Sequence, residues 1–289
     1  MTHPRPWLDG AVTRLMLGTA QWGDPYGATN AVGRLSDTAI AGIAAVAHEW
    51  EIDSVDTAAG YADAQRRLRP FAHDFTITTK VSGAGDVAGQ VSSALDDLGL
   101  TRMHAVLIHD WDGLDDTSRT RTARELGRLL DSGTVARVGV SVYDDEGLGN
   151  SVEAFTSRQC HLGVVQVPAN VLDRRLDGSA TLAALAAQGT EVVVRSAFLQ
   201  GVLLADSGGL ADHPDVARFR ASVTASGSTP MAACLEHVRS LPWATHVVVG
   251  VTSPAELEQV CETWASITPR AADDALASSD VRLIDPRRW

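Results

Sequence analysis

Short apolar runs alternate along the chain with longer segments whose apolar residues recur three or four positions apart. Eight short runs are rich in Val, Ile and Leu and are bounded by polar or Gly-rich stretches, which is typical of β-strands. These runs are 13–19, 54–57, 75–81, 105–109, 136–141, 163–167, 191–196 and 245–250. The segments between them, such as 37–50 and 87–98, have the apolar spacing of amphipathic helices.

This alternation of strand and helix predicts an α/β fold with parallel strands. Parallel strands are buried on both faces, which explains near-continuous runs such as VVVR and HVVVG. Eight strand-helix units in a chain of this length favour a closed (β/α)₈ TIM barrel over a doubly wound sheet. Because composition nowhere changes abruptly, we expect a single domain over residues 1–289. The Ser- and Gly-rich segment 206–229 lacks clear periodicity, and we expect it to be a mobile loop after the seventh strand.

Composition narrows the class of partner. The chain has 289 residues, of which 45% are hydrophobic, so it can bury a large core. Its 36 acidic residues outnumber 24 basic ones and no Lys/Arg-rich run occurs, which argues against nucleic acid or an anionic membrane and favours a small molecule. Cys160, Cys234 and Cys261 form no CxxC pair and have no His at zinc-finger spacing, so we expect a reduced, cytoplasmic protein without a metal site. We expect neither export nor a membrane anchor, because we find no signal-peptide core and no apolar run of about 18 residues.

Four polar residues lie at or just beyond the ends of three successive predicted strands. Asp56 ends the second strand and Tyr61 follows it, Lys80 lies at the end of the third, and His109 ends the fourth. In a (β/α)₈ barrel the active site is at the carboxyl ends of the strands, so these side chains would meet in one mouth. Each residue taken alone is more simply a helix cap, a solvated charge or a packing side chain. Their combination is not required by packing, and it indicates catalysis.

The four residue types suit the reduction of a carbonyl group. A carbonyl that accepts hydride needs a proton, and Tyr61 would donate it if its pKa were brought down from about 10. Lys80 would lower that pKa, and Asp56 would hold and orient the lysine. His109 would orient the substrate carbonyl and share the proton with Tyr61.

These residues lie in motifs that resemble those of the aldo-keto reductases. The motifs are LGTAQWG at 17–23, VDTAAGY at 55–61, TTK at 78–80 and LIHDW at 107–111, and the likeness runs from about Leu15 to Gln259. The resemblance implies an NAD(P)H-dependent oxidoreductase that reduces an aldehyde, ketone or sugar-like substrate to an alcohol. It also implies that Asp56, Tyr61, Lys80 and His109 are the catalytic tetrad.

The same resemblance implies a set of nucleotide-binding residues along the strand ends. They are Gly18, Thr19, Asp56, Ser141, Gln166, Arg195, Ser196, Phe198, Leu199, Gly201, Gly250, Val251, Thr252, Ser253 and Glu256. Ser141 and Gln166 would bind the nicotinamide carboxamide, although Val142 replaces the Asn that usually follows that Ser. Arg195 stands where many members have an aromatic residue stacked on the nicotinamide, and a planar guanidinium stacks as well.

The segment 250–257 resembles the motif that holds the adenosine end of the cofactor. Relatives that bind a 2′-phosphate have Lys or Arg there and often a final Asn, whereas this chain has Glu256 and Val260. If Glu256 faces the ribose, its charge repels a 2′-phosphate; the alternative is that it faces solvent. The family therefore indicates NADP(H), while this residue makes NAD(H) a real alternative.

The sequence says less about the substrate. Trp22 and Trp111 follow the first and fourth strands and would line the substrate pocket with Tyr61 and His109, unless they only pack at the rim. The opening LGTAQ with Tyr26 nearby resembles a subgroup that acts on sugar-like substrates. Two other functions stay open: a redox-neutral epimerase or dehydratase that retains its nicotinamide, and a non-catalytic barrel that senses the cofactor.

Overall fold

The computed structural model describes residues 13–289 and contains one closed barrel of eight parallel strands. The strands are β1 (Arg14–Gly18), β2 (Ser54–Asp56), β3 (Thr76–Val81), β4 (Met103–Ile108), β5 (Val135–Ser141), β6 (Val164–Pro168), β7 (Glu191–Arg195) and β8 (His246–Gly250). Each strand pairs with its neighbour in the chain, and β8 closes the barrel on β1 through pairs from Arg14–His246 to Gly18–Gly250. The predicted fold class is confirmed, and the predicted strands agree with the observed ones to within two residues at each end.

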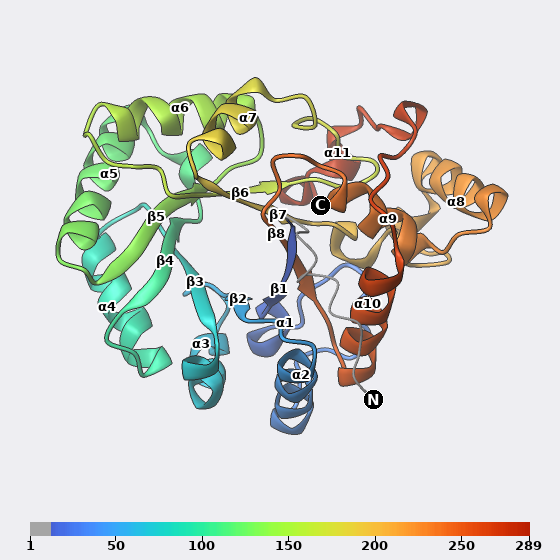
Figure 1. Cartoon of the computed structure of the whole chain (residues 1–289), viewed down its shortest axis with the longest axis horizontal. Helices are drawn as coiled ribbons and strands as arrows, with labels where there is room; N and C mark the ends of the chain where they lie inside the picture. Colours follow the sequence, from blue (N-terminus) through green and yellow to red (C-terminus); the bar gives the residue numbers. More distant parts are fainter. Residues whose placement is uncertain (1–12) are drawn as a thin grey trace.

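The helices surround the barrel (Figure 1). They are α1 (Ala20–Gly23), α2 (Asp37–Glu49), α3 (Ala64–Leu68), α4 (Val87–Leu98), α5 (Asp116–Asp131), α6 (Asp145–Thr156), α7 (Ala180–Ala187), α8 (Pro214–Ser226), α9 (Pro230–Arg239), α10 (Pro254–Ser266) and α11 (Val281–Ile284). Many begin with a side-chain cap: Ser36 accepts a hydrogen bond from the N–H of Ala39, and Asp86 accepts one from Gly89. In the described part of the chain, no helix is both long and apolar enough to cross a bilayer.

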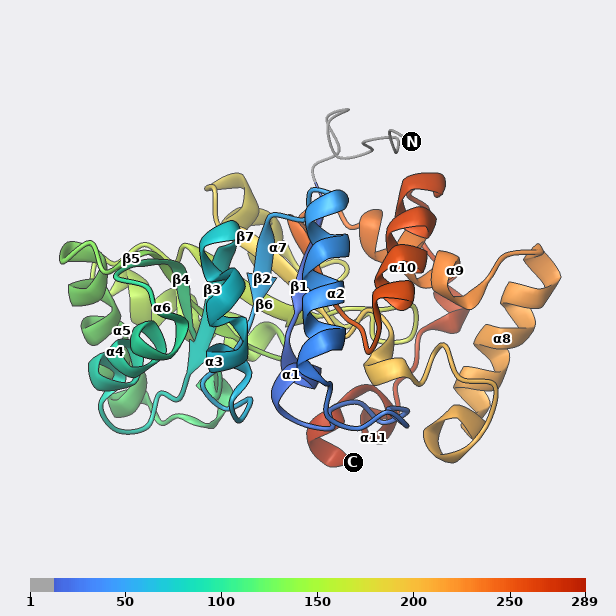
Figure 2. The ribbon, with the colours of Figure 1, turned by 90° about the horizontal axis from the view of Figure 1, so that it is seen from below.

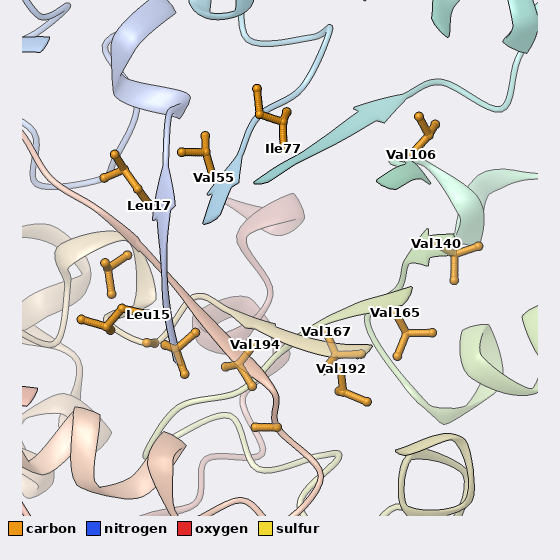
Figure 3. Close-up of a cluster of buried hydrophobic side chains, with 14 of the residues drawn as sticks. Leu15, Leu17, Val55, Ile77, Val106, Val140, Val165, Val167, Val192 and Val194 are labelled. Carbon is orange, nitrogen blue, oxygen red and sulfur yellow. The ribbon is translucent and has the colours of Figure 1, made fainter. Parts of the chain in front are cut away.

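Both faces of the barrel wall are buried, in two separate layers. Alternate strand residues such as Leu15 and Leu17 belong to the large cluster that also holds the helix residues Ile40 and Ile43; Figure 3 shows ten labelled strand residues of this cluster. The residue between them, Met16, lies instead in a small cluster inside the barrel, whose buried members are Met16, Ala105, Leu107, Val164 and Val193. This alternation is the reason why the strands read as continuous apolar runs.

The segment 206–229 differs from the loop that we predicted. It contains a short 3₁₀ turn (Gly209–Asp212) and then α8, which lies at the periphery beside α9 (Figures 1 and 2). Pro214 occupies the first helical turn, and Gly227 ends the helix at a φ of 67°. Val216, Phe219 and Val223 form a buried helical face that the surrounding Ser, Gly and Ala residues obscure in the sequence. The prediction of a loop is therefore wrong for these residues.

Candidate active site

The carboxyl ends of β2, β3 and β4 bring Asp56, Tyr61, Lys80 and His109 together. Asp56 is the last residue of β2, Lys80 lies in β3, and His109 follows β4. Tyr61 lies in the turn after β2, where its backbone carbonyl packs against Gly23. A side chain on Gly23 would place its Cβ 1.9 Å from the Tyr61 carbonyl oxygen, so only glycine allows this turn to sit so close to α1.

A buried ion pair organises this side of the mouth. The Nζ atom of Lys80 lies 2.6 Å from Oδ2 of Asp56 and donates a further hydrogen bond to the carbonyl of Thr57 at 3.1 Å. The Lys80 side chain is 1% exposed and that of Asp56 is 5% exposed. From β6, the amide of Gln166 donates to the other Asp56 oxygen at 2.7 Å. Lys80, which is the only lysine of the chain, is thus held at one position by buried polar partners.

The ammonium of Lys80 also reaches the tyrosine hydroxyl. Nζ lies 3.4 Å from the hydroxyl oxygen of Tyr61 and 5.1 Å from the centre of its ring. The rings of Tyr61 and His109 meet edge to face, with 5.8 Å between their centres. The four residues that we predicted from the strand ends therefore form one contiguous group.

The electrostatics of this group differ from our expectation in one respect. The pKa of Tyr61 is raised, because burial disfavours the phenolate and the carboxylate of Asp56 repels it. Because Lys80 is paired with Asp56, the carboxylate offsets most of the effect that the ammonium charge would have on the pKa of Tyr61. Tyr61 is accordingly a neutral hydroxyl at physiological pH, which is the protonated form that a general acid needs.

Lys80 and His109 both have lowered pKa values. Burial lowers the pKa of Lys80, and Asp56 opposes this effect through its charge and its hydrogen bond. The pKa of His109 is lowered because the walls of the mouth restrict its hydration and because Lys80 repels a second cation. The His109 ring still reaches solvent, which weakens both effects by screening, but their direction keeps the imidazole neutral at pH 7.

A pocket of about 530 Å³ extends from this group across the mouth to the start of α10. It contains most of the nucleotide-binding residues expected from the sequence, namely Gly18, Thr19, Asp56, Gln166, Arg195, Ser196, Phe198, Gly201, Gly250, Thr252 and Glu256. Four others lie outside its lining: Ser141, Leu199 and Val251 are buried, and Ser253 is the N-cap of α10. Its volume and its mainly apolar walls with a few polar groups are typical of small-molecule sites.

The pocket wall after β7 is made by unusual backbone. Ser196, Leu199 and Gln200 have φ values of 62°, 48° and 54°, and Gly201 has a φ of 92°. Left-handed conformations cost free energy for residues with a side chain and cluster at functional sites. This segment therefore has a defined, strained course along the pocket.

At the far end of the pocket, Glu256 folds back onto the start of its own helix. Its carboxylate accepts hydrogen bonds from the N–H of Thr252 at 2.6 Å and from the Thr252 hydroxyl at 2.8 Å, while Ser253 caps the N–H of Glu256. This is a capping arrangement in which a carboxylate occupies the positive end of α10. Glu256 is exposed and lines the pocket, so its charge faces this end of the cavity.

Of the four residues predicted to line the substrate pocket, Tyr61 does so; His109 contacts the Tyr61 ring but is not part of the lining. Trp22 and Trp111 do not line this pocket either, and we correct that prediction. Both are 0% exposed: Trp22 packs edge-on against Phe71, and Trp111 packs against Phe155. Their rings are part of the core between barrel and helices, because α1 and the turn after β4 direct them away from the mouth.

Apart from Tyr26, which we expected near the mouth, sequence reasoning missed one wall of the pocket. Tyr26, Gly27 and residues 29–32, in the long connection from α1 to α2, line it together with Gln21. The connection approaches the strained segment, since the Thr29 hydroxyl donates to the carbonyl of Gln200 at 3.5 Å. Asn30 accepts hydrogen bonds from the N–H groups of Val32 and Gly33, a turn that the Asn-x-x-Gly spacing indicates.

Comparison with known proteins agrees with this geometry. The profile of the aldo/keto reductase family matches residues 14–272. Among solved structures, aldo-keto reductase AKR11C1 from Bacillus halodurans superposes with a TM-score of 0.70 at 16% identity and covers 96% of this chain and 95% of its own. The protein PA4992 from Pseudomonas aeruginosa, described as a candidate aldo-keto reductase, has a TM-score of 0.66 at 22% identity over 87% of this chain and 89% of its own. No curated protein sequence gives a significant match.

The closed barrel with a polar site at the carboxyl ends of its strands is the architecture of (β/α)₈ enzymes. The family match extends over most of the chain, and the chain belongs to the aldo/keto reductase family. Members of this family are in general NAD(P)H-dependent oxidoreductases that act on small carbonyl compounds.

Proposed function

We propose that this protein reduces a carbonyl compound to an alcohol with a nicotinamide nucleotide, and that Tyr61 donates the proton. The observation that carries this proposal is the chain of contacts from Asp56 to Lys80 to the Tyr61 hydroxyl, at 2.6 and 3.4 Å. Burying an ion pair costs desolvation free energy, and a pair of hydrophobic residues would stabilise the barrel equally well or better. Its contact with a phenol at the rim of a pocket indicates a catalytic purpose.

The pocket residues fit a nicotinamide nucleotide. The amide of Gln166 lies beside Asp56 at the tetrad end, suited to a carboxamide, and the polar groups of Ser196 and Thr252 lie along the way to the start of α10. A helix N-terminus and left-handed backbone are common binding elements for phosphate groups. When bound, the nicotinamide supplies the hydride.

The side chains of the protein supply orientation and the proton. Tyr61 donates its hydroxyl proton to the carbonyl oxygen as negative charge develops there, and Lys80 stabilises the phenolate that remains. The ring of His109, neutral and edge-on to Tyr61, positions the same oxygen. Asp56 keeps Lys80 charged and in place.

Charge at the far end of the pocket favours NADH, although the family by itself indicates NADPH. Asp56, Arg195 and Glu256 are the charged residues that line the pocket among the described part of the chain. Asp56 and Arg195 lie toward the nicotinamide end, so the charge at the adenosine end is that of Glu256. A carboxylate there suits a ribose hydroxyl and repels a 2′-phosphate.

Fluorescence titration of the purified protein with NADH and NADPH, followed by turnover with a panel of aldehydes, ketones and sugars, tests the function. We expect tight binding of at least one nucleotide and consumption of one reduced nucleotide for each alcohol formed. Substrate conversion without net consumption of nucleotide would identify a redox-neutral epimerase or dehydratase instead. Binding without any turnover would identify a sensing barrel.

A further inference from the structure

Arg195 is the charged residue of the pocket that takes no part in moving the hydride or the proton; the family resemblance implied that it stacks on the nicotinamide, but its guanidinium lies against the ring of Tyr143. It ends β7, and its guanidinium extends past β6 to the end of β5, where it donates to the carbonyl of Val142 at 3.3 Å. The guanidinium carbon lies 3.9 Å from the centre of the Tyr143 ring. Its remaining side-chain contact is a long one to the hydroxyl of Ser196, at 3.5 Å.

A second arginine contacts the same tyrosine ring, but its charge is neutralised by carboxylates. Arg287, near the C-terminal end, also lies over Tyr143, at 3.6 Å from the ring centre. It forms a two-pronged pair with Asp285, at 2.9 and 2.6 Å, and contacts Asp112 at 3.3 Å. Arg287 is therefore fully paired with carboxylates and holds Tyr143 in place.

Arg195 has no such partner. Within residues 13–289 no Asp or Glu side chain comes within ion-pair distance of it, although the chain has a net charge of −12. The guanidinium is partly buried, is oriented by Tyr143, and keeps most of its N–H donors free of protein acceptors. A planar, preoriented guanidinium of this kind matches the two oxygens of a carboxylate.

We infer that Arg195 binds a carboxylate group of the substrate, and that the enzyme acts on carbonyl compounds that carry such a group. This inference rests on the proposed carbonyl reduction. Two observations favour the substrate over the cofactor pyrophosphate as the source of the anion. The guanidinium turns toward β5, next to the β4 end that carries His109, and away from Gly201 and Thr252. Its charge also acts on the two groups beside the reacting carbonyl: it opposes the rise that burial and Asp56 cause in the pKa of Tyr61, and it adds to the lowering that burial and Lys80 cause in the pKa of His109.

The test compares two aldehydes of nearly the same shape, 4-carboxybenzaldehyde and methyl 4-formylbenzoate, on the wild-type protein, Arg195→Met and Arg195→Lys. We expect wild type to prefer the acid in kcat/KM. In Arg195→Met the loss for the acid should exceed the loss for the ester by about 10- to 100-fold, the usual range for a hydrogen bond to a charged group. Arg195→Lys keeps the charge but not the planar fork, so its preference should be intermediate.

A second measurement does not depend on turnover. Calorimetry with the protein saturated with oxidised nucleotide compares benzoate with benzamide, and we expect wild type but not Arg195→Met to bind benzoate more tightly. Equal kcat/KM for acid and ester in wild type, or an unchanged ratio in Arg195→Met, would overturn the inference. It would also fail if Arg195→Met weakened nucleotide binding as much as it weakened the acid, because the guanidinium would then serve the cofactor. If wild type reduces neither aldehyde, the proposed function is in question, and the benzoate comparison still decides the role of Arg195.

Discussion

The two sides of the barrel mouth are built on different principles. Beside β2, β3 and β4, side chains form a buried polar network around the ion pair of Asp56 and Lys80. Beside β7 and β8, apart from the side chain of Arg195, the wall contains backbone in left-handed conformations and a helix start that Glu256 caps.

The first side holds its side chains in fixed positions, whereas the second side can accommodate changes. A buried network fixes each atom, because any unpaired member would carry a large desolvation cost. A backbone wall presents N–H groups and small side chains that bind a nucleotide without fixing its chemistry. Changes on the first side should therefore abolish the reaction, and changes on the second side should alter affinity or choice of nucleotide.

The sharpest test of this division is Tyr61→Phe, which removes one hydroxyl from the network. We expect carbonyl reduction in single-turnover experiments to fall by about 10² to 10⁴, the usual contribution of general acid catalysis. Nucleotide affinity, measured by fluorescence in the same preparation, should change little. A variant that keeps more than about a tenth of wild-type turnover would exclude Tyr61 as the proton donor.

Lys80→Met should affect both rate and stability. The variant leaves Asp56 buried without its cation, which costs about 3–5 kcal/mol of unfolding free energy in comparable buried pairs. The double variant Lys80→Met with Asp56→Asn is the matched control: it should regain part of the stability in urea unfolding but none of the activity. Full activity in either variant would mean that the pair is only structural.

Because Lys80 is the only lysine, ¹⁵Nζ-labelled lysine gives one NMR signal that reports its titration directly. Burial lowers the pKa of Lys80 below 10.5, so the ammonium should lose its proton at lower pH than a free lysine. Turnover should decline on the alkaline side over the same range, because the neutral amine no longer stabilises the phenolate. A signal that titrates above 10.5 would show that Asp56 outweighs the effect of burial.

Glu256→Arg tests the nucleotide side, where a smaller and selective effect is expected. A charge a few ångströms from a phosphate in partly screened surroundings is worth on the order of 1 kcal/mol, and reversing its sign should tighten NADPH relative to NADH by more than about tenfold. Glu256→Gln, which keeps a hydrogen-bonding group for Thr252, should shift the preference in the same direction but less. Both cofactors need measurement at one ionic strength, because salt screens exposed charges. Equal changes in affinity for NADH and NADPH would show that other residues distinguish the two nucleotides.

The smallest expected effect is that of Ser253→Ala, which removes the N-cap of α10. Loss of such a cap costs about 0.5–2 kcal/mol of stability, visible as a lower urea midpoint. Turnover at saturating nucleotide should be nearly that of wild type. A large loss of kcat would show that the two sides of the mouth are more tightly coupled than their construction indicates.

The sequence predicted the side-chain half of the site better than the backbone half. The order of Asp56, Tyr61, Lys80 and His109 on successive strand ends was sufficient, because parallel strands must bring their carboxyl ends together. Trp22 and Trp111 were misplaced, because a tryptophan in the turn that follows a strand points into the core as readily as into the mouth. The left-handed course of Ser196, Leu199 and Gln200 leaves no signal in residue types that seldom adopt it.

That left-handed course also shapes which sequences the segment tolerates. At Gln200, glycine or asparagine should be accepted more readily than valine or isoleucine, since β-branched side chains are poorly compatible with a φ of 54°. Leu199 has a φ of 48° but is fully buried in the cluster that packs under α8, so glycine there would remove core volume that the fold needs. In a library that contains all substitutions at both positions, we therefore expect opposite preferences: Gln200 should tolerate glycine, whereas Leu199 should require a large apolar side chain.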